Sequence, residues 1–114
     1  MTKTPTAVEA KRWLVPVSPE WKAFWFNKGA VVKSMKEMVS ILPKVPPHMF
    51  EHHVNAKKND LASWVKDVVG DEDLAKELRS VKTQKAAADA FAKRVSMLEK
   101  ILLVAPSVKP AKKK

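Results

Sequence analysis

Cysteine is absent from the sequence, and glycine occurs only twice. The lack of cysteine excludes disulfide bonds, thiolate nucleophiles and cysteine-ligated zinc or iron–sulfur centres, and it fits a reducing compartment. Two glycines cannot build a glycine-rich phosphate-binding loop. The longest apolar run, residues 101–105, falls far short of the roughly 18 residues that span a bilayer, and the N-terminus lacks the apolar stretch of a signal peptide. We therefore expect a soluble, cytoplasmic protein without membrane contact.

Positive charge is in large excess. The 114 residues include 22 Lys and Arg against 12 Asp and Glu, which gives a formal net charge of +10 at pH 7. Such a field attracts polyanions. Residues 61–80 carry three basic and five acidic side chains, whereas residues 81–114 carry nine basic and two acidic. The sequence thus predicts a polarised molecule with a basic C-terminal end.

The length, with a hydrophobic content of 46%, allows one domain with a modest core. Residues 1–10 are small, polar and aperiodic, so we predict a flexible N-terminal arm there. A single helical domain is predicted over 11–105, followed by a disordered Lys-rich tail over 106–114. Pro16 and Pro19 oppose a regular helix, so the chain around them is expected to run extended over the core.

Aromatic and β-branched residues over 24–32 indicate a short β-hairpin. Three aromatic residues, 24–26, precede Asn27-Lys28-Gly29 and the pair Val31-Val32, so the glycine falls at the turn. A helix that begins near Gly29 is the alternative.

Capping and stop signals predict four helices between residues 34 and 80. Ser34 and Glu37 match a capping box that starts the first helix, and prolines at 43, 46 and 47 end it and start a second. Asn59 or Asp60 caps a third helix, Gly70 closes it, and an aspartate at 71 caps a fourth. The residues expected to face inward are Met35, Met38, Val39, Leu42, Met49, Phe50, His53, Leu61, Trp64, Val65, Val68, Leu74, Ala75 and Leu78.

The longest helix is predicted over 83–104, where apolar residues recur at helical spacing and Pro106 follows. The predicted stripe consists of Ala87, Phe91, Val95 or Arg94, Leu98 and Leu102. Together these signals predict a mainly α fold: a compact bundle of four to five helices with a short N-terminal β-hairpin, a long C-terminal helix and a disordered basic tail.

Residues 24–78 contain three recognisable stretches: Phe24-Trp25-Phe26 with Ser34 to Met38, Phe50-Glu51-His52-His53-Val54-Asn55, and the segment from Asn59 to Ala75. This part of the chain resembles an uncharacterised archaeal and bacterial family of small helical domains. The resemblance implies a compact, mainly helical, intracellular module. It implies no activity or ligand, so no functional residue is carried over.

His48, Glu51 and His52 fit H-x-x-E-H, the pattern in which two histidines one turn apart bind zinc and the glutamate activates water. No third-ligand helix follows, and the chain leaves little room for a substrate cleft. We therefore favour the simpler interpretation, in which His53 packs inside the fold while His48 and His52 lie on the surface. No other catalytic arrangement is visible, so we predict no enzyme activity, no metal site and no cofactor.

The four tryptophans, at positions 13, 21, 25 and 64, suit core packing more than stacking on nucleic-acid bases. Trp13 is the candidate exception because charged residues precede it.

The C-terminal helix and tail carry the main functional hypothesis: non-enzymatic, sequence-nonspecific binding of DNA or RNA through phosphate contacts, in a nucleoid- or ribosome-associated protein. Lysine suits backbone contacts, whereas guanine reading favours arginine. The predicted contact residues are Lys82, Lys85, Lys93, Arg94, Lys100, Lys109, Lys112, Lys113, Lys114, Lys11 and Arg12. The alternative is a protein–protein interaction module, a homodimer or partner complex formed through Phe91, Val95, Leu98 and Leu102.

Overall fold

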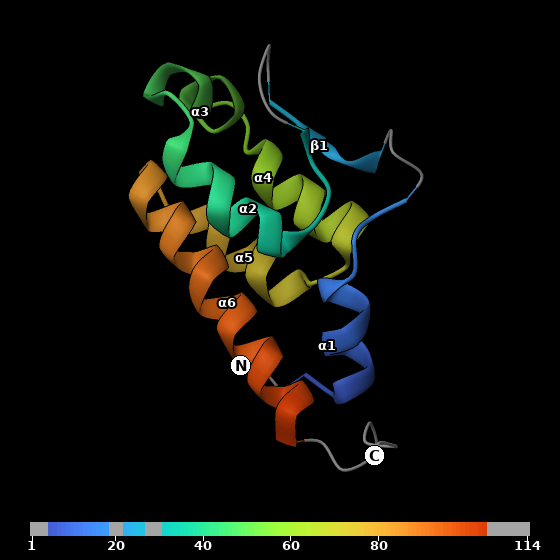
Figure 1. Ribbon diagram of the computed structural model, residues 1–114. Coiled ribbons are helices and arrows are strands. Elements are labelled where there is room, and N and C mark those ends of the chain that lie inside the picture. The colour runs from blue at the N-terminus through green and yellow to red at the C-terminus, as the bar shows by residue number, and fades with distance from the viewer. Residues whose placement is uncertain (1–4, 19–21, 27–30, 105–114) are drawn as a thin grey trace.

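The computed structural model describes residues 5–18, 22–26 and 31–104. Within these ranges six α-helices enclose one core, and a two-stranded sheet lies beside them (Figure 1). The mainly α class, the hairpin and the long C-terminal helix are confirmed. The elements are α1 (Ala7–Leu14), β1 (Phe24–Trp25), β2 (Val31–Val32), α2 (Met35–Ile41), the 3₁₀ turn η2 (Leu42–Lys44), α3 (Pro47–His53), α4 (Asp60–Trp64), the π-helical segment η3 (Val65–Val69), α5 (Glu72–Ser80) and α6 (Gln84–Val104).

Helix α1 corrects the predicted flexible arm at residues 7–10, which form its first turn, while residues 1–4 of that prediction lie outside the described ranges. Thr6 and Glu9 form a complete capping box in which each side chain accepts a hydrogen bond from the other residue's backbone N–H. Ala10 and Trp13 are buried, and α1 packs against α6. The helix ends at Leu14 because Pro16 disfavours helical geometry in the residue before it. Trp13 therefore lies within a helix.

The predicted hairpin is present, with Phe24 paired to Val32 and Trp25 to Val31 in an antiparallel ladder. Successive strand residues point to opposite faces, so Phe24 and Phe26 are buried while Trp25 is exposed. The backbone N–H of Val17 donates to the carbonyl of Lys33 at 2.7 Å, which ties the segment after α1 to the end of β2. The predicted turn residues 27–29 lie outside the described ranges.

Local signals also place the middle helices. Ser34 caps α2 by accepting from the N–H of Glu37, but the Glu37 carboxylate accepts from the N–H of Lys33 and not from Ser34. Helix α3 starts at Pro47, as predicted. Asn59 caps α4, and Gly70 ends the π-helical segment at φ 97°, a left-handed conformation that favours glycine.

Helix α6 packs against α1, α2 and α5 and forms one side of the bundle (Figure 1). The Gln84 side chain donates to the carbonyls of Leu42 and Val45 and so attaches the start of α6 to η2. No helix in the described part of the chain combines the length and apolar character needed to cross a bilayer. The described side chains of α6 that are buried are Ala87, Ala90, Phe91, Arg94, Val95 and Leu98.

Candidate nucleic-acid interface

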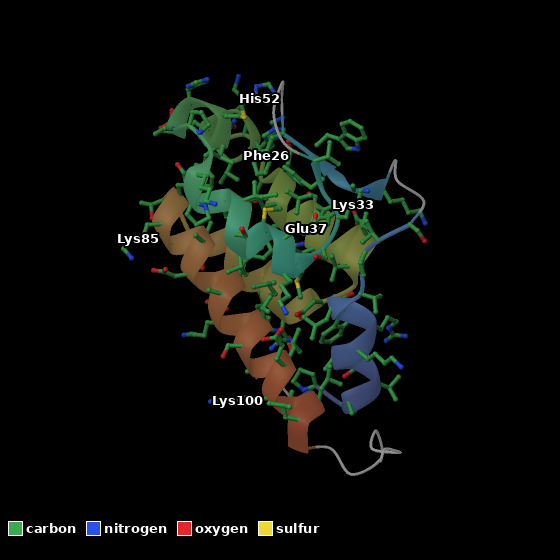
Figure 2. All side chains as sticks on the ribbon, in the orientation of Figure 1. Phe26, Lys33, Glu37, His52, Lys85 and Lys100 are labelled. Carbon is green, nitrogen blue, oxygen red and sulfur yellow. The ribbon has the colours of Figure 1, made fainter. Side chains whose placement is uncertain are left out.

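Three exposed lysines, Lys85, Lys93 and Lys100, form what we call the outer face of α6. Successive helical residues are about 100° apart, so side chains at intervals of eight and seven residues lie within about 80° of one another. Figure 2 shows Lys85 and Lys100 on the side of α6 that faces away from α2. The core residues Phe91 and Leu98 occupy the opposite side. The three lysines, which the sequence predicts as phosphate contacts, therefore lie on one solvent-facing side of α6.

Carboxylates neutralise only part of this surface. The Nζ atom of Lys85 lies 3.2 Å from Oδ2 of Asp89, one helical turn away. Lys93 and Lys100 form no ion pair with any residue that the structure describes. An exposed ion pair such as Lys85–Asp89 is weak and is screened by salt, so it leaves Lys85 able to exchange partners. Two or three positive charges are thus available to a polyanion.

Arg94 was predicted to contact phosphates, and the structure corrects this. Its side chain is only 7% exposed, and its guanidinium donates two hydrogen bonds to the fully buried Asp71, from Nε to Oδ2 at 2.6 Å and from Nη2 to Oδ1 at 2.7 Å. The Trp13 ring lies 5.6 Å from the guanidinium carbon. Asp71 also caps α5 by accepting from the N–H of Leu74. Arg94 therefore compensates a buried carboxylate and cannot reach solvent phosphates.

Three of the other predicted contact residues are exposed, and four lie outside the described ranges. Lys11 and Arg12 are exposed in the last turn of α1, where cations also complement the negative end of the helix dipole. Lys82 is exposed in the connection between α5 and α6. The tail residues Lys109, Lys112, Lys113 and Lys114 lie outside the described ranges.

A second cluster of cations was not predicted from the sequence. A groove of about 570 Å³ is lined by residues 54–59, Ser63, Arg79, Val81 and Lys82. Four of these residues are basic, Lys57, Lys58, Arg79 and Lys82, and no carboxylate is among the described residues that line it. We call this the basic groove. Two chain segments, residues 57–58 and 79–82, contribute its cations, so no single stretch of sequence signals it.

Hydrogen bonds hold the turn that carries Lys57 and Lys58. The Asn55 amide donates to the Glu51 carbonyl at 2.9 Å, and the Asn55 side-chain oxygen accepts from the N–H of Lys57 at 2.9 Å. The Asn59 amide donates to the Leu78 carbonyl at 2.9 Å, across 19 residues of sequence. This last bond sets the lysine-bearing turn against the C-terminal end of α5, where Arg79 lies.

Asp60 moderates the charge beside the groove. Its Oδ2 atom lies 2.9 Å from Nδ1 of His53 and 3.0 Å from Nζ of Lys58, and a carboxylate can only accept, so both nitrogens donate. Burial raises the pKa of Asp60, but the hydrogen bonds and charges of His53 and Lys58 outweigh burial and hold that pKa below its ordinary value. Asp60 is therefore ionised near neutral pH, and one of the four groove cations is partly neutralised.

The residues of the H-x-x-E-H pattern lie on the surface of α3. His48, Glu51 and His52 are exposed on α3, while His53 is buried against the Phe24 and Phe26 rings. Within the described ranges, no three His, Cys, Asp or Glu side chains gather in a way that suits a metal ion. The expectation that His53 packs inside while the other two histidines lie on the surface is confirmed.

Two tryptophans differ from the expectation: Trp13 is buried and Trp25 is exposed. Trp13 and Trp64 are buried, and Trp64 donates from its indole nitrogen to the carbonyl of Lys22 at 2.9 Å. Trp13, the candidate exception, is thus a core residue, because α1 turns it toward α6. Trp25 is 53% exposed on the hairpin, and Trp21 lies outside the described ranges.

The apolar stripe proposed for dimerisation is already occupied within the chain. Phe91, Val95 and Leu98 are buried against the neighbouring helices, so they cannot pair with a second copy unless the core opens. Among the described side chains of α6, the large apolar ones that are exposed are Met97 and Leu103. Three of the four residues named for that interface are therefore core residues, and the protein–protein interaction itself stays a prediction.

Comparisons with models of protein families, with curated proteins and with solved structures give no match to this chain.

The described residues present two positively charged surfaces, the outer face of α6 and the basic groove. Lys82 lines the groove and lies three residues before Lys85 of the outer face. Such surfaces bind anions by Coulomb attraction and by hydrogen bonds from ammonium and guanidinium groups.

Proposed function

We propose that the protein binds DNA or RNA through contacts with the phosphate backbone, without reading the sequence and without catalysing a reaction. The primary contact surface is the outer face of α6, supplemented by Lys82, by Lys11 and Arg12 of α1 and by the lysines of residues 106–114. In a cell this activity would suit a nucleoid- or ribosome-associated factor.

The observation that carries the proposal is the exposure of Lys93 and Lys100 on one helical face, with no ion pair to a described residue. Each lysine that meets a phosphate releases a condensed counterion, so affinity rises without any sequence-specific contact. The net charge of +10 at pH 7 also favours binding to a polyanion.

Sequence reading is not supported by the same surfaces. Bidentate recognition of guanine uses arginine, and Arg94 of α6 is committed to Asp71 inside the core. Arg12 of α1 is the one exposed arginine among the described contact residues, and all the other exposed ones are lysines. Lysine is a point charge on a flexible stem and contacts phosphates with little dependence on the base.

Fluorescence anisotropy of labelled duplex DNA and duplex RNA, titrated at several salt concentrations between about 50 and 200 mM, tests the proposal. We expect affinity to fall linearly with salt on logarithmic axes for both polymers. The double variant Lys93→Gln/Lys100→Gln should reduce the slope by about two, because each phosphate contact contributes about 0.9.

The matched control is Lys33→Gln/Lys66→Gln, which removes the same net charge from exposed positions outside α6. This control should change the slope by much less. Equal slopes for the two double variants would show that only net charge matters and would contradict the proposed surface. Absence of binding to both polymers at about 50 mM salt would contradict the function itself.

A further inference from the structure

We propose that the basic groove is a binding site for a phosphate monoester or pyrophosphate group. The groove has a volume of about 570 Å³, within the range of pockets that hold small ligands. Its residues, apart from Lys82, are separate from the surface proposed to bind the nucleic-acid backbone. The site therefore does not rest on that proposed function.

The number of cations selects this ligand class. Lys57, Lys58, Arg79 and Lys82 line one groove. Within the described ranges, Asp60 is the one carboxylate that forms an ion pair with any of them, and its partner is Lys58. A phosphodiester carries one negative charge per linkage, whereas a phosphate monoester carries close to two at neutral pH and a pyrophosphate group carries more. Lys57, Arg79 and Lys82 form no ion pair with a described carboxylate. These three cations therefore match the higher charge density of a phosphate monoester or a pyrophosphate group.

The chemistry of the lining supports direct phosphate binding. Arg79 offers a planar fork of N–H donors that fits two phosphate oxygens, and the lysines add mobile ammonium donors. Ser63 contributes a hydroxyl to the same lining. Guanidinium, ammonium and hydroxyl donors thus line one groove, and no carboxylate is among the described residues that line it.

The backbone around the groove is held in place before any ligand arrives. The Asn55 side chain bridges the start and middle of the turn, and the N–H of Asn55 donates to the Lys58 carbonyl at 2.9 Å. The Asn59 amide occupies the Leu78 carbonyl, one of the acceptors at the end of α5 that would otherwise repel an anion. A rigid site loses less conformational entropy on binding than a mobile one.

The test is a titration of the full ¹⁵N-labelled chain with inorganic pyrophosphate at constant ionic strength, followed by amide chemical shifts. We expect saturable binding with one ligand per chain and the largest shifts at residues 55–58 and 79–82. Lys57→Gln and Arg79→Gln should each weaken binding at least about threefold, and the exposed control Lys33→Gln should not. Non-saturating shifts, or a loss below threefold in either groove variant, would overturn the site.

Further titrations separate the two sources of such a group. The probes are a nucleoside monophosphate, a 5′-phosphorylated tetranucleotide and the same tetranucleotide with a 5′-hydroxyl. Tighter binding of the phosphorylated tetranucleotide than of the mononucleotide assigns the groove to strand ends, and equal binding assigns it to free nucleotides. Equal affinity for the phosphorylated and hydroxyl tetranucleotides would overturn the monoester assignment. The Lys93→Gln/Lys100→Gln variant leaves the groove intact. It should therefore bind pyrophosphate like the wild type while its duplex binding is weakened, so the two proposals can fail independently.

Discussion

Replacing Arg94 by methionine should destabilise the protein strongly, because the change leaves the Asp71 carboxylate buried without its cation. Asp71 is fully buried and accepts two hydrogen bonds from Arg94 at 2.6 and 2.7 Å. Removing one partner of a buried ion pair typically costs about 3–5 kcal/mol of unfolding free energy. Whole domains are stable by only about 5–15 kcal/mol, so this loss is a large fraction of the total.

Urea unfolding followed by far-UV circular dichroism measures the loss directly. The melting temperature should fall by about 12–20 °C, since 1 kcal/mol corresponds to roughly 4 °C in a domain of this size. Lys93→Met is the matched control. Its side chain is exposed one residue away, so the effect should stay within about 0.5 kcal/mol.

A double-mutant cycle with Asp71→Asn distinguishes the ion pair from simple loss of packing. Asparagine retains a side-chain oxygen that can cap α5, so Arg94→Met/Asp71→Asn removes both buried charges while keeping the cap. We expect the double variant to be at least about 1 kcal/mol more stable than the sum of the single effects. Additive effects, or a loss below about 1 kcal/mol for Arg94→Met alone, would refute the reasoning.

Three further predictions concern other parts of the fold. Gly70→Ala should lower the unfolding free energy by about 1–2 kcal/mol in thermal melts, because φ is 97° and an added Cβ would lie 3.4 Å from Nε1 of Trp13; an unchanged melting temperature would contradict this. Asp60 has a lowered folded-state pKa, so its stabilising contribution is present above the unfolded pKa near 3.8 and disappears as pH falls through the folded value. Urea midpoints of wild type and Asp60→Asn should therefore converge on acidification, and divergence would count against the pairing with His53. Trp25→Ser should change stability by less than about 1 kcal/mol, because the side chain is about half exposed; a larger loss would show that the ring packs.

Local interactions explain which elements were predictable. The caps at Ser34, Asn59 and Asp71 each depend on atoms within three residues of the cap, so the sequence pattern contains both partners. The register of the hairpin likewise follows from alternation of buried and exposed side chains. Helix α1 was missed although Thr6 and Glu9 form a capping box, because so short a helix depends on packing against α6.

The sequence by itself determined the helical class, the strong positive charge and the exposure of the lysines on α6, because composition and periodicity are local properties. Only the tertiary structure decided which charges are available. Arg94 lies beside Val95 in the predicted apolar stripe, but its partner Asp71 is 23 residues away. The basic groove similarly depends on the bond from Asn59 to Leu78, which brings Lys57 and Arg79 to one place. Contacts between residues so distant in the chain arise from packing of the whole core, and no local pattern contains both partners.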